Sequence, residues 1–149
     1  MKITPAIRFH VFLLLPLALA SMLLGEPALD KKSGEWERNT ASRDLFAAGS
    51  ATTVTGTVLS TNKLGVGPDG EGVQVRVSTG DGDLTVHMAP RWFILENDLN
   101  LTRGERLNIV GVKIQFNRKP VIMATEVEQR NRKVILRDLA TGQPRWNRK

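Results

Sequence analysis

Apolar and polar residues alternate in a series of short runs that begins at Thr53. The first run, TVTGTVLST over residues 53–61, is rich in threonine and valine and predicts a β-strand. Gly56 lies in its middle, where a bulge or a tight bend uses a residue without a Cβ atom. The following residues, 62–72, contain four glycines and a proline. They are predicted to form a loop.

The next two runs predict a β-hairpin with one apolar and one polar face. Valines occupy every second position of the first strand, and Leu84, Val86 and Met88 do the same in the returning strand. The sequence TGDGD between them predicts the turn. It lacks the further carboxylates that a calcium loop requires. The outer face is expected to carry five polar side chains, which are Gln74, Arg76, Ser78, Thr85 and His87.

A short helix is predicted after the hairpin. Pro90 suits the first turn of a helix, where its missing N–H costs nothing. Residues 89–99 (APRWFILENDL) then supply apolar side chains, among them Trp92 and Phe93. This segment spans only two to three turns, so it depends on packing for its stability. We expect it to close one end of a small sheet.

Two longer strands and one short piece complete the pattern. Apolar positions from residue 107 to 116 change phase near Gly111, which predicts a bulge in a strongly curved strand. A turn follows, and residues 121–130 form the fifth predicted strand. Residues 133–137 are a shorter strand-like piece that precedes a basic end.

The N-terminus has the layout of a secretory signal peptide. Lys2 and Arg8 precede an apolar run, and Ala18-Leu19-Ala20 offers a cleavage site of small residues. We interpret residues 1–20 as the signal, with cleavage between residues 20 and 28. Residues 21–51 are interpreted as a linker with a turn or two of helix near residues 42–48. The alternative is an uncleaved inner-membrane anchor, for which the run is short and interrupted by proline. Both interpretations place the working domain outside the cytoplasm, in the periplasm or secreted.

Composition narrows the chemistry further. The 149 residues fit one domain, assigned to residues 52–130, with a basic strand or tail over 131–149. The chain has no cysteine, which excludes disulfides, thiolate nucleophiles, cysteine-ligated metals and covalently attached haem. The formal charge is +6, and removal of the two bases in the signal leaves +4. This mild excess is weak evidence for a nucleic-acid partner.

Five strands with a helix between the third and fourth resemble the OB-fold, a five-stranded Greek-key barrel. The resemblance covers residues 53–130. It rests on Gly56, on the helix PRWFILENDL and on the phrase L-x-x-G-E-x-L-x-I-x-G that starts at Leu101. With the signal peptide, the chain is similar to exported bacterial OB-fold proteins. The resemblance implies an all-β fold with one short helix, and it specifies a fold rather than a ligand.

OB-folds bind ligands across the outer face of strands two and three, between two flanking loops. The resemblance therefore implies a ligand-binding face on this chain. Its members are Gln74, Arg76, Ser78, Thr85, His87, Lys63, Arg118 and Lys119. This face is polar and mildly basic, which suits a partner protein or an anionic ligand in the cell envelope.

Two alternatives use the same face. Single-stranded DNA is the first, although base stacking needs aromatic platforms and the predicted face has none. The second alternative is an accessory role in haem or metal binding through His87. For this role, the chain resembles the exported OB-fold haem chaperone in fold and location alone. A lone histidine on a strand is more often an ordinary surface residue.

The basic C-terminal segment has two interpretations. It is either a solvated edge strand protected by charge or a docking element for an acidic partner or anionic lipid headgroups. We favour docking, because Trp146 has no other evident purpose. The predicted docking residues are Arg130, Arg132, Lys133, Arg137, Arg145 and Trp146.

The sequence contains no set of residues typical of catalysis. There is no serine–histidine–aspartate set, metal cluster or phosphate-cradling loop, and GVGPDGEG lacks the lysine and the strand-to-helix context of such a loop. We therefore expect an exported, non-catalytic binding protein without a cofactor, accessory to an envelope system.

Overall fold

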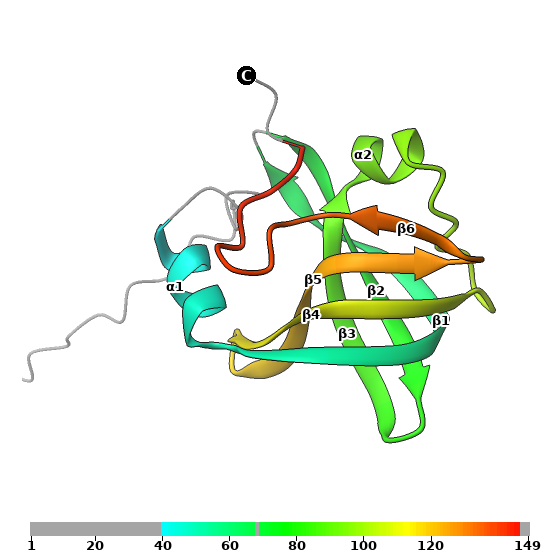
Figure 1. The fold of residues 1–149 in the computed structure, drawn as a ribbon, viewed down its shortest axis with the longest axis horizontal. Helices are drawn as coiled ribbons and strands as arrows, with labels where there is room; N and C mark the ends of the chain where they lie inside the picture. The colour runs from blue at the N-terminus through cyan, green and yellow to red at the C-terminus, as the bar shows by residue number, and fades with distance from the viewer. Residues whose placement is uncertain (1–39, 68, 147–149) are drawn as a thin grey trace, which may run out of the picture.

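The structure is a computed structural model that describes residues 40–67 and 69–146. The predicted signal peptide lies outside the described residues. Eight elements follow one another in this part of the chain (Figure 1). They are α1 (Thr40–Ala48), β1 (Ser50–Gly67), β2 (Gly70–Thr79), β3 (Gly82–Pro90), α2 (Arg91–Glu96), β4 (Arg106–Phe116), β5 (Lys119–Gln129) and β6 (Arg132–Ile135). The all-β class is confirmed. No helix in the described residues combines the length and apolarity needed to cross a membrane.

The strands form one mostly antiparallel sheet in the order β3-β2-β1-β4-β5-β6. β3 also pairs in parallel with β5, through Val86 with Ile122 and His87 with Met123. This pairing, here called the β3–β5 seam, connects the first strand of the sheet with the fifth. The sheet therefore curves back on itself around an apolar interior (Figure 1).

The predicted loop over residues 62–72 is wrong. β1 continues to Gly67 and β2 begins at Gly70, so that the two strands form a long two-stranded arm. Lys63 pairs with Val73 in this arm, and its amine lies 2.7 Å from the carboxylate of Glu71. Glycine disfavours strands only weakly, and the cross-strand pairing offsets its low propensity here.

The predicted bulge in the fourth strand is confirmed. The register between β4 and β5 shifts between Val110 and Gly111. A Cβ atom at Gly111 would lie 2.5 Å from the carbonyl oxygen of Met123, so the close approach of the strands requires glycine. The shift directs the apolar side chains before and after it to opposite faces of the sheet. Leu107 and Ile109 therefore join the interior, whereas Val112 and Ile114 join a second apolar cluster.

Helix α1 covers that second cluster. It lies where a turn or two of helix is predicted within the linker, and together with the start of β1 it packs on the folded domain. Phe46 of α1 is buried against Val112, Ile114, Val121 and Met123. A buried aromatic ring on one turn of helix is enough to hold a segment whose own helix propensity is modest.

Helix α2 is shorter than predicted but occupies the predicted place between β3 and β4. Pro90 is its N-terminal cap residue, and Ile94 is buried in the interior. Trp92 and Phe93 are half-buried, and their rings meet edge to face with centroids 5.7 Å apart. The indole Nε1 of Trp92 donates to the carbonyl oxygen of Asp69 at 2.6 Å, which ties the helix to the β1–β2 arm.

The C-terminal segment is part of the core, and the prediction of an exposed docking tail is wrong for Arg137 and Trp146. Both are almost fully buried, with exposed fractions of 1% and 2%. Trp146 packs on Phe93 of α2, and the guanidinium of Arg137 stacks 4.7 Å from its ring centroid. Arg137 also donates to the carbonyl oxygen of Ala124, directly after the paired residues of the seam. The segment therefore closes one end of the β3–β5 seam.

A tight turn brings this segment back onto the domain. The carboxylate of Asp138 accepts hydrogen bonds from the backbone of Ala140 and Thr141 and from the Thr141 hydroxyl. These bonds, those of Thr141 first, lower the pKa of Asp138. Gly142 has a φ of 71°, and a Cβ atom there would lie 2.8 Å from the Phe46 ring. The turn thus also holds α1 in place.

Candidate functional site

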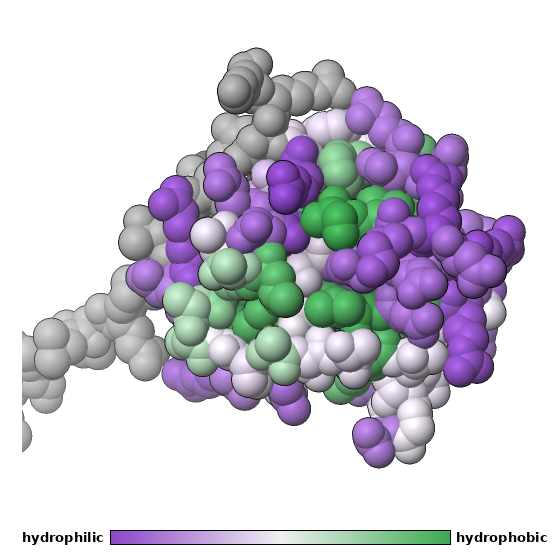
Figure 2. All heavy atoms as spheres, viewed as in Figure 1, coloured by the Kyte–Doolittle hydropathy of each residue, from purple (hydrophilic) through white to green (hydrophobic). Residues whose placement is uncertain are grey.

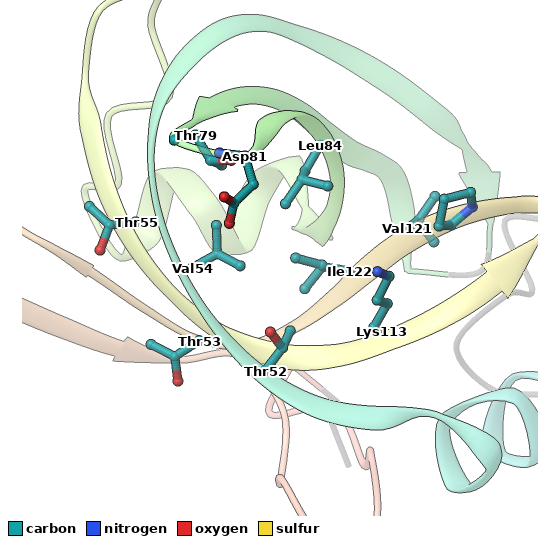
Figure 3. A pocket seen from close by; sticks show the side chains of 12 residues that line it. Thr52, Thr53, Val54, Thr55, Thr79, Asp81, Leu84, Lys113, Val121 and Ile122 are labelled. Atoms are coloured by element: carbon teal, nitrogen blue, oxygen red, sulfur yellow. Dashed lines mark hydrogen bonds between the residues drawn. The ribbon is translucent and has the colours of Figure 1, made fainter.

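The other end of the β3–β5 seam opens into a pocket of about 400 Å³, which we call the mouth (Figure 3). It lies between the first half of β1, the β2–β3 turn and the adjoining parts of β4 and β5. The pocket arises because β1 stops pairing with β2 at Thr57, while its residues 50–57 continue to pair with β4. The lining residues are Thr52, Thr53, Val54, Thr55, Thr79, Gly80, Asp81, Leu84, Lys113, Pro120, Val121 and Ile122.

The floor of the mouth is apolar. Val54, Leu84 and Ile122 come from three different strands and point toward one another in the pocket (Figure 3). Ile122 is buried, whereas Val54 and Leu84 remain half-buried and form the surface on which a ligand would rest. The walls around this floor are polar, because four threonines, Asp81 and Lys113 also line the pocket. An apolar floor bordered by polar groups can accept a ligand and fix its orientation.

Two opposite charges stand on facing walls of the mouth. Asp81 lies on the β2–β3 turn and Lys113 on β4, and both side chains are directed toward the opening (Figure 3). Both residues are exposed, and neither forms an ion pair with another described residue. The hydroxyl of Thr79 accepts from the Asp81 amide at 3.2 Å and donates to the Gly82 carbonyl at 2.7 Å, which fixes the turn.

The face predicted from the OB-fold resemblance is only partly available. Arg76 is exposed but lies 2.8 Å from the carboxylate of Asp83. Gln74, Ser78 and Thr85 are half-buried. Such a surface ion pair contributes about 0.2–1 kcal/mol at most and leaves Arg76 able to exchange partners. These contacts do not bring several charged or reactive groups together on the face.

His87 does not lie on an exposed face, and that prediction is wrong. Its exposed fraction is 1%, because it packs edge to face on Phe116 with ring centroids 4.9 Å apart. Burial, and then the nearby charge of Arg137, lower the pKa of His87 to about 4. The imidazole is therefore neutral at pH 7. No group of three histidine, aspartate or glutamate residues that could hold a metal occurs within residues 40–67 and 69–146.

The flanking cations predicted for the face come from two elements, the β1–β2 arm and the β4–β5 turn. Lys63 is paired with Glu71 on the β1–β2 arm. Its hydrogen bond lowers the pKa of Glu71, despite the opposing effect of burial. Arg118 and Lys119 are exposed at the β4–β5 turn, where Asn117 and Arg118 adopt φ angles of 50° and 62°.

The remaining residues of the predicted docking tail are surface cations. Arg130, Arg132 and Lys133 form ion pairs with Glu105, Asp98 and Glu126 at 2.6, 3.2 and 2.8 Å. Arg145 is exposed beside Asp138 and lowers its pKa slightly. Strongly hydrophilic side chains gather over the β5–β6 turn at the right of Figure 2. These residues are folded against the domain rather than extended as a tail.

The sequence model of the MamS/MamX magnetosome protein family matches residues 50–134. The chain belongs to the MamS/MamX magnetosome protein family. The match begins at the first residue of β1 and ends within β6. A search of curated proteins finds no match to this member of the family.

The matched stretch of this MamS/MamX chain contains every residue that lines the mouth. Helix α1, Arg137 and Trp146 lie outside it. The mouth is thus built entirely from the part of the chain that the family model describes, whereas the segment that closes the opposite end of the seam lies beyond that part.

Sequence reasoning missed the mouth, although some of its signals were visible. The alternation predicts Leu84 on the apolar face of the hairpin and TGDGD as its turn, and the structure confirms the turn. Val54 and Lys113 carry no motif. Their significance depends on the point at which β1 leaves β2, which the alternation of threonine and valine does not encode.

Proposed function

We propose that this MamS/MamX family member is a non-catalytic OB-fold binding protein that acts as an accessory of the magnetosome. Its function is to hold a partner protein at the mouth. The family match supports the association with the magnetosome, and the N-terminal sequence supports export.

Three observations support the OB-fold assignment. The first five strands have the neighbour order β3-β2-β1-β4-β5, and β3 pairs again with β5. Helix α2 lies between β3 and β4, as in that fold. Gly56 lies where β1 approaches β2 closely. A Cβ atom there would be 3.0 Å from the Ser78 carbonyl oxygen, so the approach favours glycine.

The mouth is the observation that carries the proposed binding role. Its apolar floor is open, whereas the apolar residues at the opposite end of the seam are covered by Trp146 and Arg137. An apolar side chain of a partner would displace water from Val54 and Leu84, which stabilises a complex by about 25 cal/mol per Å² of apolar surface buried. The facing charges of Asp81 and Lys113 would then orient the partner rather than determine its affinity.

Site-directed photo-crosslinking tests this role in the full chain. A photoreactive residue is placed at Thr79 on the rim of the mouth, and in a parallel sample at Lys133 on β6. We expect the first to form an adduct with a component of the purified magnetosome fraction, and we expect Leu84→Asp to abolish that adduct. Leu95→Asp is the matched control, because Leu95 is 63% exposed on α2, away from the mouth.

Equal adducts from Thr79 and Lys133, or an adduct that persists in a folded Leu84→Asp protein, would contradict binding at the mouth. Circular dichroism of each variant establishes that it is folded. An adduct that depends on Leu84 supports the proposed site.

A further inference from the structure

The first half of β1 presents one unpaired backbone edge to the mouth. Four consecutive residues, Thr52, Thr53, Val54 and Thr55, line the pocket. Side chains alternate between faces along a strand, so a run of four lining residues indicates that the strand faces the pocket with its edge. In Figure 1 this part of β1 runs directly below β4, the strand with which it pairs.

The hydrogen bonds of β1 show which residues face the pocket with their backbone. The Val58 amide donates to the Glu105 carbonyl, and the Val58 carbonyl accepts from the Gly104 amide, both on the β4 side. Successive residues of a strand direct their N–H and C=O groups to opposite edges. Thr53, Thr55 and Thr57 therefore direct theirs away from β4. Thr57 pairs with Ser78 of β2, but the pairing ends there, and no residue of the described chain pairs with that edge at Thr53 and Thr55.

The side chains around this edge suit an extended segment rather than a compact ligand. Thr53 and Thr55 are exposed on one face of β1, while Val54 points into the apolar floor beside Leu84. A strand laid along the edge would direct alternate side chains onto that floor and the others to solvent. Asp81 on one wall and Lys113 on another would pair with a base and an acid on the added segment.

We infer that the mouth binds an extended peptide segment of its partner by strand addition to β1, with main-chain hydrogen bonds to Thr53 and Thr55. This inference rests on the proposed function and specifies the kind of partner segment. The segment alternates apolar and polar residues and carries both a base and an acid. Recognition through the backbone would supply affinity, and the floor and the two charges would supply register and direction.

Substitution of Thr53 tests this mode of binding, because its N–H is directed away from β4 and its side chain is exposed. Thr53→Pro removes one edge N–H, and proline is tolerated on an edge strand where that N–H faces solvent. Thr53→Val keeps the N–H and changes only the side chain. Thr55 is a poorer choice, because its hydroxyl donates to Asn108 at 2.8 Å.

The probe is the acetylated, amidated heptapeptide Lys-Val-Thr-Val-Thr-Val-Asp, titrated into the ¹⁵N-labelled full chain to millimolar concentration. We expect the amide resonances at positions 53 and 55 to shift more than that at position 54, and their hydrogen exchange to slow. Thr53→Pro should weaken binding at least tenfold, and Thr53→Val should leave it within twofold. The fully N-methylated peptide should not bind.

Equal binding of the N-methylated peptide, or no shift at positions 53 and 55 with either peptide, would overturn strand addition. The N-methylated peptide keeps the test decisive even where Thr53→Pro does not fold. Photo-crosslinking to the magnetosome fraction distinguishes a failure of strand addition from a failure of the proposed function. An adduct lost in Leu84→Asp but retained in Thr53→Pro would leave the mouth as the binding site and remove the backbone contacts.

Discussion

The two ends of the β3–β5 seam are built from the same pair of strands, yet the C-terminal segment covers only one of them. Beyond His87 and Met123, the C-terminal segment supplies Arg137 to a carbonyl of β5 and Trp146 to the ring of Phe93. Before Val86 and Ile122, no comparable segment of the described chain covers the floor. The closed end therefore contributes stability, while the open end retains apolar surface for a partner. The comparison predicts that substitutions at the two ends affect different measurements.

The largest effect is expected from Trp146→Ala. Removing a buried tryptophan leaves a cavity between Phe93 and Arg137 and should lower the free energy of unfolding by about 3–5 kcal/mol. Urea denaturation of the full chain measures this loss, with Arg145→Ala, an exposed neighbour, as the control expected to change it by less than about 0.5 kcal/mol. A small loss for Trp146→Ala would mean that the closed end is not closed by this residue.

Low pH should destabilise the folded chain, because His87 is buried as a neutral imidazole at the closed end of the seam. Its pKa is about 4 in the folded chain and 6.5 unfolded, so the unfolded chain binds more protons between these values. The resulting contribution of His87 to the free energy of unfolding is about 3 kcal/mol. It is fully present above pH 6.5 and is lost as the pH falls toward 4. Urea denaturation from pH 7.5 to 4 measures it. His87→Phe should remove this part of the pH dependence, and an identical profile for both proteins would refute the assignment.

Gly142→Ala tests whether the C-terminal turn holds α1. The substitution strains a residue at a φ of 71° and places a methyl group against the Phe46 ring. We expect a loss of about 1–3 kcal/mol in the free energy of unfolding. Gly80→Ala is the control, because a Cβ atom there meets nothing within 4 Å. Equal stability of the two variants would show that the contact with Phe46 relaxes without cost.

The smallest effect on stability belongs to the mouth. Lys113→Ala and Asp81→Ala each remove an exposed charge and should change the free energy of unfolding by no more than about 0.5 kcal/mol. They should instead weaken capture of the partner, which photo-crosslinking from Thr79 measures. If either substitution destabilised the protein by several kcal/mol, the contrast between a stabilising end and a binding end would fail.

Local pattern was sufficient to predict much of the sheet. The hairpin, the place of the helix after Pro90 and the phase change at Gly111 all follow from the spacing of apolar residues within short windows. The arm over residues 62–72 was missed, because its strands are held by pairing with each other rather than by their own glycine-rich composition.

The errors at the candidate site have a common cause. The alternation along the strand correctly places His87 on the face that points away from the interior valines. It does not show that other segments of the chain cover this face. Arg137, Phe116 and Trp146 belong to segments far away in the sequence, and only the folded chain brings their side chains near His87 and the seam. Charge alone likewise suggested a free basic tail, because arginine is rarely buried unless it has a partner, and the carbonyl partner of Arg137 is supplied only by the folded chain.

The change of partner along β1 also has a kinetic consequence. Its second half pairs with β2, which follows closely in the sequence, whereas its first half pairs with β4, so that Thr55 and Asn108 meet across 53 positions of sequence. Local pairings form before distant ones, because closing a long loop costs more entropy. We therefore expect the edge at Thr53 to be exposed on both sides during much of folding. At high protein concentration, that interval favours pairing between copies, so refolding yield should fall more steeply with concentration than final stability suggests.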